Sequence, residues 1–220
     1  MESKKKKVLL NRALFVRRPL DSAELPALTA LFHRFSEPGD YQVLLRRGDS
    51  LLRRFAVRVV EEGGMPEVNL DLAGAPPESN DCAPEQYTLQ PGGLMGFYAS
   101  KGVGQYSIAI SPLGRVGKKT GGEAEAKPAI LDSRKAIPAG DLFSATLVRE
   151  GRYRVTNLEG RGEAWIEVRL PKGERYPMAH AELVEYGRDG FKPEKVALLA
   201  GQSVVFQCSL PARLRIEPSG

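Results

Sequence analysis

Apolar and polar side chains alternate along several short runs of this chain. In each run every second side chain is apolar, which is typical of a β-strand with one face toward a core and the other toward water. Turns rich in Gly and Pro separate the runs, as at residues 37–40 and 91–93. The pattern predicts an all-β chain with strands in residues 41–45, 55–60, 68–72, 106–110, 153–157, 165–170 and 213–217.

One segment, residues 21–35, also allows a helix, because Asp21 or Ser22 could cap it with Pro26 in the first turn. The matching segment later in the chain, residues 132–146, contains Pro138 and Gly140, which disfavour a helix. We therefore expect a short turn at each Asp-Ser pair, followed by a strand in both segments.

The pattern also repeats. Residues 84–100 (PEQYTLQPGGLMGFYAS) align with residues 193–209 (PEKVALLAGQSVVFQCS) at an offset of 109. Three other stretches recur at offsets of 112, 109 and 113, with the changes at turns, where insertions are tolerated. These stretches are residues 39–43 with 151–155, 56–59 with 165–168, and 65–70 with 178–183.

We interpret the repeat as a tandem duplication of a small antiparallel β-sandwich, or a jelly-roll or barrel-like domain. Residues 1–113, with a basic N-terminal tail, form the first copy, and residues 128–220 form the second. Residues 114–127 between them are dominated by Gly, Lys, Glu and Ala, a composition typical of a linker.

Two segments resemble a known family. GFKPEKVALLAGQSVVF (190–206) is similar to the opening segment of cupredoxin-like sandwiches, and REGRYRVTNLEGRGEAWIEV (149–168) resembles their closing hairpin, with the order along the chain reversed. The resemblance implies a sandwich fold. The family's copper ligands, two His, one Cys and usually a Met, are not matched in these segments, so no copper site or electron transfer is implied.

Charge and hydropathy narrow the classes of function. The net charge is +5, and four of the lysines are consecutive, Lys4 to Lys7, so the rest of the chain is nearly balanced. We interpret this tail as a solvated terminus, with nucleic-acid contact as the alternative. No apolar run approaches the length of about 20 residues that spans a bilayer, and no secretory signal is recognisable. We expect a cytoplasmic protein without membrane contact.

Few residues suggest chemistry. Cys82 and Cys208 are the two cysteines, at non-equivalent positions, so a disulfide framework is not expected. His33 and His180 are the two histidines, and no local spacing supplies a metal site. A Cys–His nucleophile pair with Cys208 is the catalytic alternative, but its place in a strand favours packing. We expect no catalytic residue, metal or cofactor.

Residues shared by both copies serve the fold, so function is expected where the copies differ. The first copy has an extended loop, residues 73–83, that contains Asn80 and Asp81. The second copy has the single Trp and an Arg-rich strand region, which can bind an acidic partner. The alternative is a solvated face compensated by neighbouring Glu residues. The candidate partner-binding residues are Arg149, Arg152, Arg154, Arg161, Trp165, Arg169, Asn80 and Asp81.

These observations favour a non-catalytic binding or assembly protein that recognises a peptide or protein partner through β-sheet surfaces, with a homodimer as a further expectation. Three alternatives stay open. They are an enzyme whose site is assembled from dispersed loops, a structural protein of a particle or capsid, and a nucleic-acid-binding protein that uses the Lys tail and the Arg-rich strands.

Overall fold

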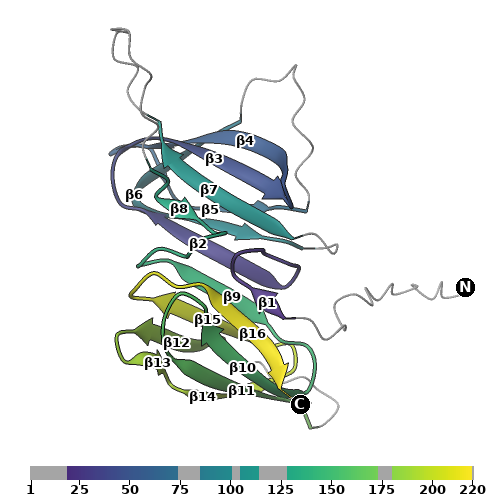
Figure 1. The fold of residues 1–220 in the computed structure, drawn as a ribbon. Coiled ribbons are helices and arrows are strands. Elements are labelled where there is room, and N and C mark those ends of the chain that lie inside the picture. The colour runs from purple at the N-terminus through teal and green to yellow at the C-terminus, as the bar shows by residue number, and fades with distance from the viewer. Residues whose placement is uncertain (1–18, 74–84, 101–104, 114–127, 173–179, 220) are drawn as a thin grey trace, which may run out of the picture.

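The computed structural model describes residues 19–73, 85–100, 105–113, 128–172 and 180–219. These residues form strands and no helix, and the strands stack in a column (Figure 1). The architecture is a β-solenoid of about four turns. The expected all-β class is therefore confirmed, whereas the duplicated sandwich, jelly roll or barrel is wrong.

The strands form two sheets. The five-stranded sheet contains, in spatial order, β1 (Leu20–Asp21), β16 (Leu214–Ser219), β10 (Gly151–Asn157), β11 (Glu163–Arg169) and β14 (Lys195–Leu199). The 11-stranded sheet contains β13 (Gly190–Lys192), β12 (Glu182–Gly187), β15 (Ser203–Cys208), β9 (Leu142–Thr146), β2 (Thr29–Phe35), β6 (Gln86–Tyr98), β4 (Ser50–Val59), β3 (Gly39–Arg47), β7 (Tyr106–Pro112) and β8 (Leu131–Asp132), with β5 (Met65–Asp71) paired to β6.

The large sheet explains why two separate sandwiches do not form. β2, from the first copy, pairs with β9, from the second copy, in antiparallel register. One sheet of 11 strands therefore runs through both copies. The repeat in the sequence shows which strands resemble one another, but it contains no information about which strands pair across the copies. The segment predicted as a linker, residues 114–127, lies outside the described residues.

The two copies also exchange short strands. β1 of the first copy pairs with β16 of the second, and β8 of the second copy pairs with β7 of the first. The buried Ser22 hydroxyl accepts a hydrogen bond from the Leu214 N–H at 3.0 Å, and the buried Ser133 hydroxyl accepts one from the Ile108 N–H at 3.0 Å. The Ser that follows each exchanged strand thus adds a hydrogen bond to the other copy.

The Asp residues before these serines form the expected turns. The Asp21 carboxylate accepts a hydrogen bond from the Ala23 N–H at 2.9 Å, and Asp132 accepts one from the Arg134 N–H at 3.2 Å. Such bonds define Asx turns. The strands β2 and β9 follow, so the choice of strand over helix in residues 21–35 and 132–146 is confirmed.

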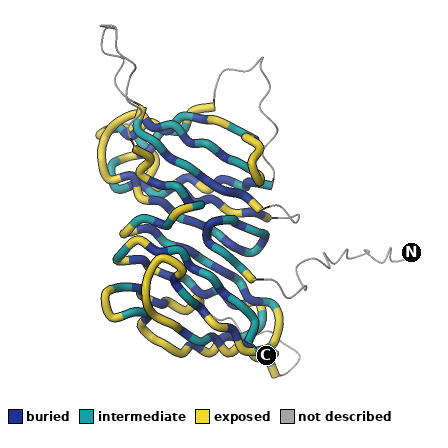
Figure 2. Tube along the Cα trace, viewed as in Figure 1, coloured by how far each residue is buried: buried dark blue, intermediate teal, exposed yellow. Residues whose placement is uncertain are grey.

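The core follows the alternation of the sequence. Buried positions recur along the strands and exposed positions gather at the turns (Figure 2). Val43 and Val57 in the first copy and Val155 in the second are completely buried. Burying one such side chain stabilises a fold by about 1.5–3 kcal/mol, so the alternating runs supply the main stabilising contribution.

The sandwich fold implied by the resemblance to cupredoxin-like proteins is wrong, because the chain is a β-solenoid. The same pattern of burial explains why the two segments resemble that family. In the segment 190–206, the apolar residues that match the family are inward-facing residues of strands β13, β14 and β15. Any β structure with one buried face produces this spacing of apolar residues, so the spacing does not identify a family. The residues are Phe191, Val196, Leu198, Val204 and Phe206.

Equivalent strands pair in the same way in the two copies. β4 runs parallel to the first part of β6, and β11 runs parallel to β14. The Ala56 N–H donates to the Glu85 carbonyl at 3.0 Å, and the Trp165 N–H donates to the Glu194 carbonyl at 2.7 Å. Trp165 therefore occupies in the second copy the position that Ala56 occupies in the first.

Candidate functional site

The outer face of the five-stranded sheet gathers four of the predicted residues. On β10, Arg152 and Arg154 are exposed and flank a buried Tyr, as the alternation predicts. On β11, Trp165 and Arg169 point to the same side, because they are four residues apart on one strand. We call this surface the Arg–Trp face and define it by Arg152, Arg154, Trp165, Glu167, Arg169, Lys195 and Glu217, which alternate outward on β10, β11, β14 and β16.

Trp165 lies in the middle of a row across the sheet. Strand pairing sets Glu217 opposite Arg154, Arg154 opposite Trp165, and Trp165 opposite Lys195. Arg154 reaches Glu217 at 3.5 Å and Glu163 on β11 at 4.0 Å. Both ion pairs are exposed, and such pairs contribute about 0–1 kcal/mol. The row therefore places an aromatic ring between cations without contributing much to stability.

Arg152 stacks on the Trp165 ring. Its guanidinium carbon lies 4.0 Å from the ring centroid, a cation–π contact that stabilises by about 0.5–1 kcal/mol at an exposed site. Within the described residues Arg152 forms no ion pair, although strand pairing places Glu167 opposite it. Glu167 instead binds Arg169 at 2.9 Å. The N–H donors of Arg152 are thus left facing solvent.

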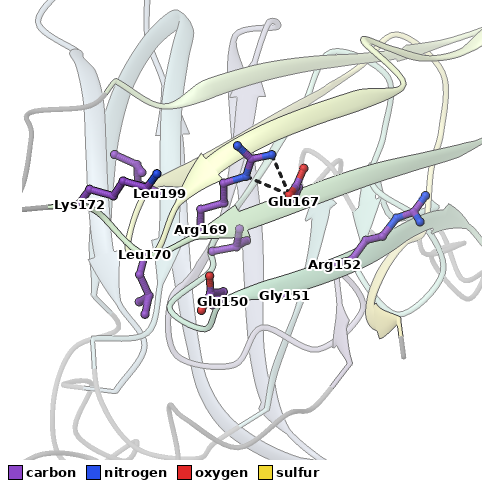
Figure 3. A pocket seen from close by; sticks show the side chains of 9 residues that line it. Glu150, Gly151, Arg152, Glu167, Arg169, Leu170, Lys172 and Leu199 are labelled. Carbon is purple, nitrogen blue, oxygen red and sulfur yellow. Dashed lines mark hydrogen bonds and ion pairs between the residues drawn. The ribbon is translucent and has the colours of Figure 1, made fainter.

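A groove borders this face where β10 begins and β11 ends (Figure 3). Its volume is about 630 Å³. Cations and apolar side chains share the lining: Arg152, Arg169 and Lys172 supply charge, while Leu170 and Leu199 supply apolar surface. Such a mixture suits a ligand that combines anionic and aliphatic groups, since each kind of surface then meets its complement.

The other predicted residues lie elsewhere. Arg149 and Arg161 are exposed in turns, where their backbone carbonyls accept hydrogen bonds from Tyr153 at 3.0 Å and Tyr186 at 3.3 Å. Neither belongs to the Arg–Trp face. Asn80 and Asp81 lie outside the described residues.

Sequence reasoning missed several residues of this surface. Glu217 and Lys195 complete the row through Trp165, and Lys172 and Leu170 line the groove. The alternation in residues 213–217 was the available signal for Glu217, because it places Arg215 and Glu217 on one face. Nothing in the sequence placed Lys195 beside Trp165, since that contact depends on a parallel pairing between distant strands.

A buried polar cluster lies apart from this surface, where β2 meets β9. His33 Nδ1 lies 2.7 Å from the Asp141 carboxylate, and both residues are buried. His33 Nε2 has no hydrogen-bond partner among the described residues. Cys208 is completely buried nearby, and burial, followed by the charge of Asp141, raises the pKa of its thiol to about 12. A thiol that stays protonated is a poor nucleophile, which supports the packing interpretation.

His180 contributes its backbone carbonyl, which accepts a hydrogen bond from the Gln202 side chain at 2.5 Å. Across the described ranges no group of three or more His, Cys, Asp and Glu residues is arranged to hold a metal ion. In the same ranges no helix has the length and apolar character needed to cross a membrane.

Comparisons with known proteins give no relative of this chain: no family model, no curated protein and no solved structure matches it.

Proposed function

We propose that this chain is a non-catalytic binding or assembly protein that recognises a peptide or protein partner through the Arg–Trp face. One observation carries the proposal. A large aromatic side chain and two arginines, Trp165, Arg152 and Arg154, occupy outward positions of a sheet, where the fold does not need them. Trp and Arg are the residues that dominate binding energy at protein interfaces.

The face is a better binding surface than the sheet edges. The described edge strands β1, β8 and β13 have only two or three residues, and the longer edge strand β5 carries the charged Glu67 and Asp71. On β14, Lys195 lies at the edge, and the Leu199 N–H and carbonyl are already used by Gln202 at 2.9 and 2.8 Å. Short edges that carry Lys resist the addition of a further strand. A partner therefore contacts side chains of the face rather than extending the sheet.

Affinity capture with matched variants tests the proposal. The full chain serves as bait, alone and as Trp165→Ala or Arg154→Gln, and Gln42→Ala on the equivalent strand of the first copy is the control. A partner that is retained by the chain and by the control but lost by both face variants supports the function. Retention of every partner by Trp165→Ala would contradict it.

A second copy of the chain is one partner that this test detects separately. Sedimentation equilibrium of the purified chain reports self-association, and Trp165→Ala weakens it if the Arg–Trp face joins two copies. Self-association that both face variants leave unchanged would place a dimer interface elsewhere.

A further inference from the structure

We infer that the groove beside the Arg–Trp face binds an extended, acidic peptide segment in which every second residue, on one face, is a carboxylate or an aliphatic residue. This inference rests on the proposed function and specifies the chemistry of its partner. It is carried by two cations that form no ion pair among the described residues, by their separation, and by the apolar surface beside one of them.

The first cation is Arg152. Its guanidinium stacks on Trp165 at 4.0 Å and has no ion-pair partner among the described residues. A stacked guanidinium keeps its N–H donors in the plane of the group, where they can hold a carboxylate through two parallel hydrogen bonds. Trp165 therefore holds Arg152 in place for a carboxylate.

The second cation is Lys172. It is exposed, lines the groove and forms no ion pair within the part of the chain that the structure describes. In Figure 3 it lies at the opposite end of the groove from Arg152, with Arg169 and Glu167 between them. Because Arg169 is neutralised by Glu167 at 2.9 Å, the two free cations are separated rather than contiguous.

The apolar side chains of the groove lie at its Lys172 end (Figure 3). Leu170 is 57% exposed, more than any other large hydrophobic side chain of the described residues, and the half-buried Leu199 also lines the groove. In an extended peptide, side chains two residues apart lie about 7 Å apart on one face. Such a segment can place carboxylates at both ends of the groove and rest its aliphatic groups on Leu170.

The carboxylates of the region disfavour a nucleic acid as the ligand. Glu150 lines the groove, and Glu163 and Glu217 flank Arg154. The closely spaced phosphates of a nucleic acid would be repelled by these carboxylates. A peptide with a few separate carboxylates can place them at Arg152 and Lys172 alone. The distribution of charge thus favours an acidic peptide.

The single Trp of the chain is a built-in reporter for this site, because it contacts Arg152. The full chain is titrated with a short blocked peptide of sequence Glu-Ser-Leu-Ser-Glu, which presents Glu and Leu on one face, and with the same peptide carrying Gln or Lys in place of Glu. We expect a saturable change in Trp165 fluorescence with the Glu peptide and at least a tenfold weaker response with the other two. Calorimetry repeats each titration without dependence on fluorescence.

Variants assign the response to the groove. Arg152→Gln and Lys172→Gln are each expected to weaken binding of the Glu peptide at least tenfold. Arg58→Gln, on the corresponding surface of the first copy, is expected to leave the affinity unchanged. Equal binding of the Glu and Gln peptides, the absence of saturable binding, or tighter binding of a single-stranded oligonucleotide would overturn the inference. Loss of a captured partner in Trp165→Ala without any binding of the Glu peptide would overturn this inference alone and leave the proposed function standing.

Discussion

The two copies present equivalent outer faces with different side chains: a paired Asp and Arg in the first copy, and Arg stacked on Trp in the second. In the first copy, Asp40 and Arg58 lie opposite each other and form an ion pair at 2.7 Å. At the same two positions the second copy has Arg152 and Glu167, so the charges are exchanged between the strands. Yet Arg152 turns away from Glu167 to stack on Trp165.

The neighbouring row differs more. In the first copy Gln42 lies between Ala56 and Ser111, all uncharged and of small or moderate size. The second copy has Arg154 in the place of Gln42, between Trp165 and Glu217. Because both rows are carried by the same strand pairing, the scaffold folds without Arg or Trp at these positions. The difference teaches that the second face carries side chains that the fold does not require.

Erasing this difference is expected to have the largest effect. The quadruple variant Arg152→Asp, Glu167→Arg, Arg154→Gln and Trp165→Ala gives these four positions the residues of the first copy, Asp40, Arg58, Gln42 and Ala56. Because Trp and Arg at interface centres each contribute about 2 kcal/mol or more, we expect partner capture to fall at least 100-fold with an unchanged thermal unfolding midpoint. Undiminished capture would show that the comparison has no functional content.

The β2–β9 strand pair, which we call the seam between the copies, allows a second comparison, between its two ends. β2 and β9 pair so that His33 and Asp141 lie at one end, and Thr29 and Ala145 at the other. Asp141→Ala removes the acceptor of His33 and of the Arg34 N–H at 3.3 Å, and leaving buried donors unpaired costs about 1–3 kcal/mol each. Urea denaturation is expected to show a loss of about 3 kcal/mol.

The matched control makes the two ends of the seam alike. His33→Ala combined with Asp141→Thr leaves no unpaired imidazole, so we expect most of the lost stability to return. A double variant less stable than Asp141→Ala would contradict this account of the pair.

The exchanged strands allow a smaller test. Ser133→Ala removes the hydroxyl that accepts from Ile108 and donates to the Ala23 carbonyl at 3.2 Å, and Ser22→Ala removes the acceptor of the Leu214 N–H. We expect a loss of about 2 kcal/mol for Ser133→Ala and about 1 kcal/mol for Ser22→Ala in urea denaturation. The exposed Ser50→Ala is the control, and equal effects of all three would refute a role for the buried hydroxyls.

Two equivalent turns before β2 and β9 differ by one residue. Leu28 has a φ of 71° and Gly140 a φ of 91°. A side chain in this left-handed region costs about 1–2 kcal/mol, and a Cβ at Gly140 meets no atom within 4 Å. Gly140→Leu is therefore expected to lower stability by about 1 kcal/mol through backbone strain alone. An unchanged unfolding midpoint would contradict this reasoning.

The smallest effect near neutral pH concerns Cys208, which stands where the first copy has Ala99. The thiol pKa is raised from 9.0 to about 12 by burial, so the unfolded chain ionises this thiol at a lower pH than the folded one. Its contribution to stability is complete below pH 9 and is lost as pH rises toward 12. The free energy of unfolding should fall more steeply with pH in the wild type than in Cys208→Ala over this window, and parallel curves would be inconsistent with the raised pKa.

Local alternation was sufficient to predict seven of the 16 described strands, and the outward direction of Arg152 and Arg154, because both depend on neighbouring residues. The pairing of β2 with β9 was not predictable, because it depends on contacts between residues more than 100 positions apart. The sequence repeat also misaligned β5 by one position. It matched the buried Leu70 with Leu183, which is 50% exposed, whereas the pairing with β6 and β15 matches Leu70 with Val184. A shift of one residue reverses the face of every side chain.

The exchange of short strands has a consequence for how the chain is made. β1 is synthesised before every other described strand, and its partner β16 is synthesised after all of them. Residues 20–22 must therefore stay unpaired on the ribosome until nearly the whole described chain has emerged. Pairing between such distant segments is slow, because a long loop has to close first. The five-stranded sheet is thus completed last, and with it the row that surrounds Trp165.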